Sequence, residues 1–342
     1  MKALVLTAYR RLEIKDVPTP APGPRDVRVR VRACGICGSD VHGYDGSSGR
    51  RIPPLVMGHE AAGVVEAVGA EVRRFKAGDR VTFDSTVHCG ECVFCRAGQV
   101  NLCDRRQVIG VSPGEYKRDG AFAEALVVPE RIVCAVPAAV PLEHAAMVEP
   151  LSVAVHAVER ARIAAGDTVV VVGCGMIGLL TLQAAKAAGC GRLVAVDLDA
   201  GRLEQARRLG ADVTLGAGAD VAAAVGELTG GRGADVALEA VGATAPIATA
   251  IRSLRKGGTL VLIGNVTPKV EVDLQAIVTR ELSVLGTCAS SGEYEKSLAL
   301  LAKGAVKLDG LISAIASLEE GPAWFERLYA GEPGLMKVIL TP

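Results

Sequence analysis

The chain has 342 residues, of which 50% are hydrophobic and 22% are charged. This length is too great for one ordinary domain and predicts two, each able to bury a sizeable core. The 38 basic and 38 acidic side chains give a formal net charge of +0, without the basic excess that is typical of proteins that bind nucleic acid or anionic membranes. We therefore expect a small-molecule partner, with no nucleic acid and no membrane.

Neither a secretion signal nor a membrane span is expected. The N-terminus lacks the ordered charged, apolar and small-residue regions of a signal peptide. Residues 168–185 carry no charge, but three glycines interrupt them, which favours a buried strand leading into a buried helix. We expect a cytoplasmic protein, in which clustered cysteines indicate metal ligands before disulfides.

Residues 1–150 predict mostly β-structure. Apolar and polar side chains alternate through residues 27–32, as in a half-buried strand, and residues 63–69 and 79–82 predict further short strands. Frequent glycines between these segments are typical of the turns of a small barrel.

The pattern changes near residue 151, where short apolar runs begin and Ala-rich helical stretches separate the first five of them. Strands that alternate with helices predict an α/β fold with a parallel sheet and right-handed crossovers. A set of six strands matches the doubly wound dinucleotide-binding fold. The six runs are residues 168–173, 192–197, 212–216, 234–240, 258–264 and 282–286, and the tail adds a helical pattern at 295–303 and an apolar run at 337–340.

The first run leads directly into a glycine-rich turn. Gly173 allows the tight turn, Gly175 lets the backbone approach a pyrophosphate, and Gly178 permits close packing of helix on strand. The helix that follows offers free N–H groups to the phosphates. The second run ends at Asp197, whose carboxylate can bond the ribose hydroxyls and repels a 2′-phosphate, so the cofactor is expected to be NAD. Arg202 can hold such a phosphate, or can lie along the adenosine of NAD.

Four cysteines stand within a short segment, at Cys89, Cys92, Cys95 and Cys103. Four thiolates close a tetrahedral zinc shell and leave no open position for a substrate, so this site is expected to be structural. His88 adjoins the cluster, but a fifth ligand is unnecessary.

A second constellation contains Cys37 and His59, one thiolate and one imidazole ligand. Catalytic zinc typically has three protein ligands and one open position, so a third ligand is needed. Glu60 and Glu149 are both candidates, and the sequence alone does not choose between them.

These motifs resemble the zinc-containing medium-chain dehydrogenases. Gly-Ile-Cys-Gly-Ser-Asp-Val-His at 35–42, Gly-His-Glu at 58–60, the four cysteines, the glycine-rich turn and Asp197 occur in that family's order. The resemblance implies a GroES-like β-barrel catalytic domain at 1–152, a Rossmann NAD-binding domain at 153–291 and a C-terminal return to the catalytic domain at 292–342. It also implies one catalytic and one structural Zn²⁺.

The resemblance also implies roles for individual residues. Ser39 is expected to accept the substrate proton and His42 to lead it to solvent, while Asp40 holds the tautomer of His59. The expected residues along the cofactor are Ile177, Ile263, Gly264, Asn265, Thr287 and Cys288.

The segment Glu-Pro-Leu-Ser-Val-Ala-Val-His that begins at Glu149 is similar to the polyol dehydrogenases related to sorbitol dehydrogenase. It implies an NAD-dependent oxidation of a polyol's secondary alcohol. The polyol is sorbitol-like and could carry a phosphate, for which Tyr116, Lys117 and Arg118 are candidate binders. The alternatives are a 2,3-butanediol or L-threonine 3-dehydrogenase, or a zinc- and nucleotide-binding protein without catalysis. A homo-oligomer, tetramer or dimer, is expected.

Overall fold

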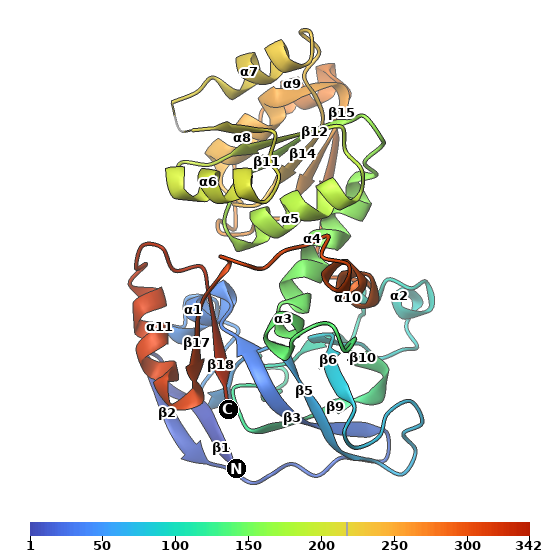
Figure 1. Ribbon diagram of the computed structural model, residues 1–342, viewed down its shortest axis with the longest axis vertical. Helices are drawn as coiled ribbons and strands as arrows, with labels where there is room; N and C mark the ends of the chain where they lie inside the picture. The colour runs from blue at the N-terminus through green and yellow to red at the C-terminus, as the bar shows by residue number, and fades with distance from the viewer. Residues whose placement is uncertain (217) are drawn as a thin grey trace. The chain divides into compact units, whose positions relative to one another are not determined.

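The computed structural model describes residues 1–216 and 218–342, and the chain divides into two compact units. The first unit contains Met1–Glu149, Tyr294–Ala302 and Leu308–Pro342, so both chain termini belong to it (Figure 1). The second contains Pro150–Glu293 and Lys303–Lys307. No described helix is long and apolar enough to span a bilayer, and the uncharged stretch at 168–185 forms a strand and most of a helix.

The first unit is built on antiparallel β-structure, as expected for a GroES-like domain. On β3 (Asp26–Gly35) the side chains of Val27, Val29 and Val31 are buried, which confirms the alternating pattern. Its main sheet has the order β10-β6-β5-β3-β18-β17, with β9 also pairing with β3. The other strands are β10 (Val133–Ala135), β6 (Arg80–Phe83), β5 (Glu60–Val68), β18 (Lys337–Thr341), β17 (Ile312–Ser317) and β9 (Ala125–Pro129); smaller sheets pair β2 (Arg11–Asp16) with β1 (Lys2–Ala8) and β4 (Leu55–Val56), and β7 (Thr86–Val87) with β8 (Gln107–Val108).

Helices of the first unit carry two segments that the sequence did not predict as helical. The motif after Cys37 forms α1 (Gly38–Tyr44), and Glu149 lies in the first turn of α4 (Val148–Ala161), which continues into the second unit. The remaining helices are α2 (Val93–Arg96), α3 (Leu142–Ala146), α10 (Tyr294–Ala302) and α11 (Gly321–Tyr329), and short 3-10 turns lie at Val100–Leu102, Glu130–Ile132 and Leu318–Glu320.

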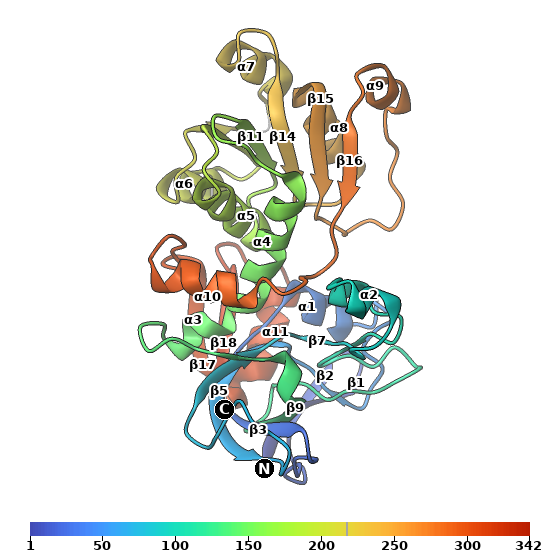
Figure 2. The ribbon, with the colours of Figure 1, turned by 90° about the vertical axis from the view of Figure 1, so that its right-hand side faces the viewer.

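The second unit is a doubly wound α/β domain. Its six strands are parallel in the order β13-β12-β11-β14-β15-β16, which confirms the predicted fold. Helices lie on both faces of the sheet, with α5 and α6 on one side and α8 and α9 on the other (Figure 2). The strands are β13 (Val213–Leu215), β12 (Arg192–Val196), β11 (Thr168–Val172), β14 (Ala234–Glu239), β15 (Leu254–Leu262) and β16 (Ser283–Gly286); the helices are α5 (Met176–Ala187), α6 (Ala200–Arg208), α7 (Val221–Leu228), α8 (Thr244–Ser253) and α9 (Leu274–Thr279), the last of which the sequence did not predict.

Candidate active site and metal centres

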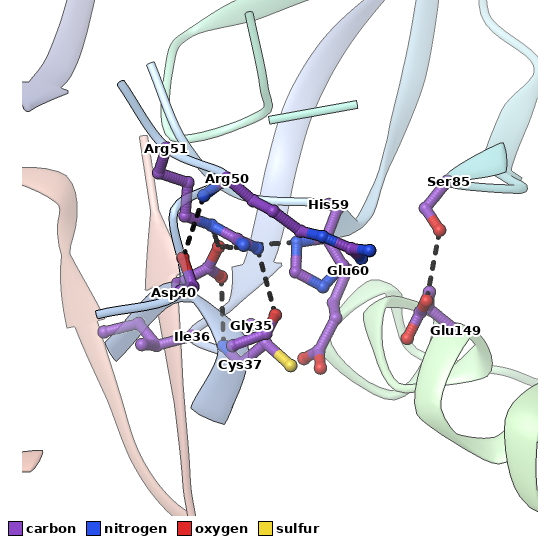
Figure 3. A network of polar contacts seen from close by, with 12 residues as sticks. Gly35, Ile36, Cys37, Asp40, Arg50, Arg51, His59, Glu60, Ser85 and Glu149 are labelled. Atoms are coloured by element: carbon purple, nitrogen blue, oxygen red, sulfur yellow. Dashed lines mark hydrogen bonds and ion pairs between the residues drawn. The ribbon is translucent and has the colours of Figure 1, made fainter. Parts of the chain in front are cut away.

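Strand pairing brings Cys37, His59 and Glu60 together. Glu60 begins β5 and pairs with Gly35 at the end of β3, two residues before Cys37. One ligand atom from each of the three side chains lies within 4.8 Å of the others (Figure 3). A thiol, an imidazole and a carboxylate form a donor set suited to zinc.

The carboxylate of Asp40 lies next to the imidazole ring of His59. Its Oδ1 is 3.4 Å from His59 Nδ1, and its Oδ2 accepts a hydrogen bond of 3.2 Å from the backbone N–H of Cys37. Burial alone would raise the pKa of Asp40, but the charges of His59 and Arg51 outweigh it and hold this pKa well below its usual range. An ionised Asp40 at this place orients the His59 ring.

Glu60 is held by a lysine from the C-terminal strand. Lys337 Nζ donates to Glu60 Oε2 at 2.6 Å and to the carbonyl of Ile36 at 3.0 Å. Within residues 1–216 and 218–342, the buried Oε1 of Glu60 has no hydrogen-bond partner. An orphaned carboxylate oxygen beside a thiol and an imidazole fits a bound cation, because a buried oxygen without a partner is costly.

Glu149 lies to one side of this group in Figure 3, where it faces Ser85. Ser85 Oγ donates to Glu149 Oε1 at 3.1 Å. Burial raises the pKa of Glu149, and the negative charge of Glu60 raises it further, while His59 opposes both. Of the two predicted glutamates, Glu60 is buried and grouped with Cys37 and His59, whereas Glu149 is half-buried and lies to one side of them.

The two predicted proton carriers lie on α1. Ser39 is half-buried and its Oγ accepts a hydrogen bond of 3.0 Å from Arg51 Nη2, while His42 is exposed. Sequence reasoning missed Arg51 and Ser85, for which no local pattern exists. It also missed Lys337, although a lysine that heads an apolar run was a signal.

The four-cysteine lobe gathers as its spacing predicts, with one sulfur of each residue within 4.8 Å of the others. Backbone N–H groups of Glu91 and Cys92 donate to Cys89 Sγ and lower the pKa of Cys89 to about 6. This favours the thiolate that zinc requires. His88 Nδ1 lies 3.9 Å from Cys95 Sγ, outside the group of four sulfurs.

In the second unit the glycine-rich turn has the geometry its residues predict. Gly173 has a φ of +92°, and a Cβ on Gly178 would lie 1.7 Å from the carbonyl oxygen of Gly173. Among residues 1–216 and 218–342, leaving out Gly175 and its chain neighbours, no heavy atom lies within 4 Å of the Cβ position at Gly175, the N-cap of α5. The turn therefore leaves open space for a phosphate beside the N-terminus of α5, the end of a helix that favours an anion.

Asp197 follows β12 and supports this turn. Its Oδ2 accepts a hydrogen bond from the N–H of Cys174 at 2.6 Å, and its Oδ1 accepts one from the N–H of Asp199 at 2.9 Å. Arg202 Nη1 lies 4.0 Å from Asp197 Oδ2. The other predicted cofactor residues lie in the same unit, Ile177 in the first turn of α5 and the rest after the carboxyl ends of β15 and β16. These are Ile263, Gly264, Asn265, Thr287 and Cys288.

Known proteins resemble both units. Residues 23–138 match the alcohol dehydrogenase GroES-like domain and residues 177–303 match the zinc-binding dehydrogenase family. Sorbitol dehydrogenase of Bacillus subtilis is 34% identical over 100% of this chain and 97% of its own length. D-xylulose reductase A of Aspergillus niger is 38% identical over 96% of this chain and 94% of its own.

The chain belongs to the zinc-containing medium-chain dehydrogenases. A solved structure described as a zinc-binding dehydrogenase, from Sinorhizobium meliloti 1021 and bound to NADP, superposes with a TM-score of 0.90 at 36% identity, covering 100% of this chain and 99% of that one. The protein is an oxidoreductase that uses a nicotinamide dinucleotide and zinc.

Proposed function

We propose that this dehydrogenase oxidises a secondary alcohol of a sorbitol-like polyol and prefers NAD to NADP. The observation that carries the proposal is the group of half-buried Cys37 with buried His59 and Glu60, with Glu149 to one side of it. The names of the two relatives, a sorbitol dehydrogenase and a D-xylulose reductase, support the polyol class.

Cys37 and His59 would hold the catalytic zinc together with one glutamate, and Cys89, Cys92, Cys95 and Cys103 would hold the structural one. When bound, the catalytic zinc supplies Lewis acidity that lowers the pKa of the substrate hydroxyl. Glu60 and Glu149 would hold the zinc ion one at a time, because one thiolate and one carboxylate already balance the charge of Zn²⁺. The carboxylate that is not bound orients a water or the substrate hydroxyl.

Ser39 accepts the hydroxyl proton and at the same time releases its own hydrogen to the ribose hydroxyl of the cofactor. His42, exposed at the end of the same short helix, then leads the proton to solvent. In the second unit, Gly173, Gly175 and Gly178 receive the pyrophosphate and Asp197 the adenosine ribose. Arg202 lies along the adenosine, and Ile177, Ile263, Gly264, Asn265, Thr287 and Cys288 line the rest of the cofactor.

An unphosphorylated substrate is favoured. Tyr116 Oη accepts from the N–H of Val108 at 3.0 Å, Arg118 Nε donates to Gln107 at 3.0 Å, and Lys117 lies 3.5 Å from a carboxylate oxygen of Asp119. All three candidate phosphate binders therefore have partners within their own loop.

A substrate panel tests the proposal. Polyols, their phosphates, 2,3-butanediol and L-threonine are each supplied with NAD or NADP, and reduced cofactor is followed by absorbance. Sorbitol-like polyols with NAD should give the highest kcat/KM. Faster turnover of butanediol or threonine would reassign the substrate, and a zinc-loaded chain inactive on the whole panel would favour a non-catalytic role.

Three further features belong to the same proposal. Residues 1–152 with 292–342 form the catalytic part, and residues 153–291 the NAD-binding part. The chain forms a homotetramer or dimer through the edge of the Rossmann sheet, where exposed apolar side chains gather on β16, on α9 and in the loop before it; light scattering measures this state. The exposed apolar residues are Val266, Val272, Leu274, Val278 and Val284.

We also place the protein in the cytoplasm, because cysteines that hold zinc rather than form disulfides suit a reducing compartment.

A further inference from the structure

Arg51 is a buried arginine inside the catalytic unit, with 4% of its surface exposed. Its Nε and Nη2 donate to Asp40 Oδ1 at 3.2 and 3.0 Å, and Nη2 also donates to Ser39 Oγ at 3.0 Å. In Figure 3 its guanidinium stands beside Asp40, on the side away from Glu149. One side chain thus contacts both the partner of His59 and the proposed proton acceptor.

The surrounding backbone is shaped around this arginine. A Cβ on Gly43 of α1 would lie 1.8 Å from Arg51 Cδ, so the helix approaches this closely only because residue 43 is glycine. On either side of Arg51, Ser112 N–H donates to the Arg50 carbonyl at 2.9 Å and Ile52 N–H to the Ser112 carbonyl at 3.2 Å. Hydrogen bonds therefore fix the backbone on both sides of Arg51, and this limits where its guanidinium can lie.

We propose that Arg51 is a positioning residue that couples the proton acceptor to the metal ligand. Its donation to Ser39 Oγ occupies one lone pair and turns the Ser39 hydrogen away from the guanidinium. The other lone pair can then receive the substrate proton as Ser39 passes its own hydrogen on towards His42. Its donation to Asp40 fixes the carboxylate that orients His59. The Ser39 half of this inference rests on the proposed function; the Asp40 half does not.

A simpler role would be neutralisation of the buried Asp40 charge, for which any cation suffices. A lysine distinguishes the two roles, because an ammonium is a point charge and cannot reproduce the planar fork that reaches two acceptors. The Ser39 arm of the proposal, which is the contact with Ser39, is therefore tested by Arg51→Lys. The Asp40 arm, which is the contact with Asp40, is tested by Arg51→Met. Arg32, which is exposed on β3, provides matched control variants Arg32→Lys and Arg32→Met.

In Arg51→Lys we expect two zinc ions per chain and unchanged NAD binding, with kcat lower by about 10- to 100-fold. The solvent deuterium isotope effect on kcat should increase, because the proton step becomes slower. In Arg51→Met, chelator competition should show the more weakly held zinc released at about 10- to 100-fold lower chelator concentration than in wild type. The Arg32 variants should match wild type in every measurement.

Wild-type kcat and isotope effect in Arg51→Lys would overturn the Ser39 arm, and wild-type zinc affinity in Arg51→Met would overturn the Asp40 arm. If Arg51→Met fails to fold, zinc release from Arg51→Gln replaces it. Ser39→Ala separates this inference from the proposed function. An active Ser39→Ala refutes the role of Ser39 itself, whereas an inactive Ser39→Ala beside a fully active Arg51→Lys refutes only the coupling.

Discussion

Lys337 Nζ lies 2.6 Å from Glu60 Oε2, and both side chains are buried. This ion pair connects the last strand of the chain to the first residue of β5, next to His59. It holds one carboxylate oxygen and leaves the other free to meet a metal. Lys337 therefore competes with the metal for the charge of Glu60.

Lys337→Met should destabilise the metal-free protein, because Glu60 then remains as a buried, unpaired carboxylate. Breaking a buried pair in this way costs about 3–5 kcal/mol. Added zinc should recover part of the loss by giving Glu60 a new partner. Urea unfolding with and without zinc measures both effects, with Lys303→Met on the exposed surface as the control. An equal loss in both conditions would show that Glu60 does not meet the metal.

Glu149→Gln should reduce turnover more than it reduces NAD binding. Glutamine keeps an oxygen for the Ser85 hydrogen bond but removes the charge beside the metal ligands. Loss of such a group typically costs about 10- to 100-fold in activity or metal affinity. Steady-state kinetics and cofactor fluorescence measure the two quantities, with Glu60→Gln run in parallel. Normal turnover in Glu149→Gln would remove Glu149 from the mechanism.

Cys92→Ser should lose one zinc per chain and keep the other. The four sulfurs of the lobe lie within 4.8 Å of one another, so each is expected to supply one of the four ligands of a single zinc ion. Structural zinc contributes on the order of 10 kcal/mol in isolated small domains, and this larger unit should lose less. Elemental analysis counts the metal, and Cys134→Ser, outside the lobe, should retain two ions. Two ions in Cys92→Ser would refute the structural site.

Asp197→Ala should weaken NAD binding and shrink the preference for NAD over NADP. A charged hydrogen bond is worth about 1.5–3 kcal/mol, or roughly 10- to 150-fold. Asp197 also accepts from the N–H of Cys174, so the variant loosens the glycine-rich turn as well. Asp197→Asn, which retains one acceptor oxygen, should lose less. The idea fails if wild type already binds NADP more tightly in a fluorescence titration.

The contact between half-buried His156 and buried Glu293 in the second unit should make the free energy of unfolding depend on pH. The ring nitrogen Nδ1 and Oε1 are 2.7 Å apart, and although burial would raise the pKa of Glu293, the contact with His156 lowers it below 4.5. A carboxyl with a lowered pKa contributes stability above its ordinary pKa and loses it as the pH falls through the lowered value. The stability gap between wild type and His156→Gln should therefore close below pH 4.5, as measured by urea unfolding. A gap that persists at lower pH would contradict this.

The motifs that the sequence revealed are those whose partners are close along the chain. The four cysteines sit within one loop, and the glycines of residues 173–178 form one turn, so spacing alone predicts which atoms meet. Alternating burial on β3 and the strand–helix periodicity of the second unit likewise follow from local patterns. These features determined the fold class, the cofactor motif and the structural metal site.

Tertiary structure decided what surrounds the catalytic metal. Gly35 of β3 pairs with Glu60 of β5 on one side and with Ile339 of β18 on the other. This register places Lys337 of β18 against the carboxylate of Glu60. An isolated β-bridge between Arg51 and Ser112 places Arg51 within hydrogen-bond distance of Asp40. Lys337 and Glu60 are 277 residues apart in the sequence, and their contact depends on strand register and on the burial of two charges together. A one-residue change of register would separate these charges, so only the folded sheet brings them into contact.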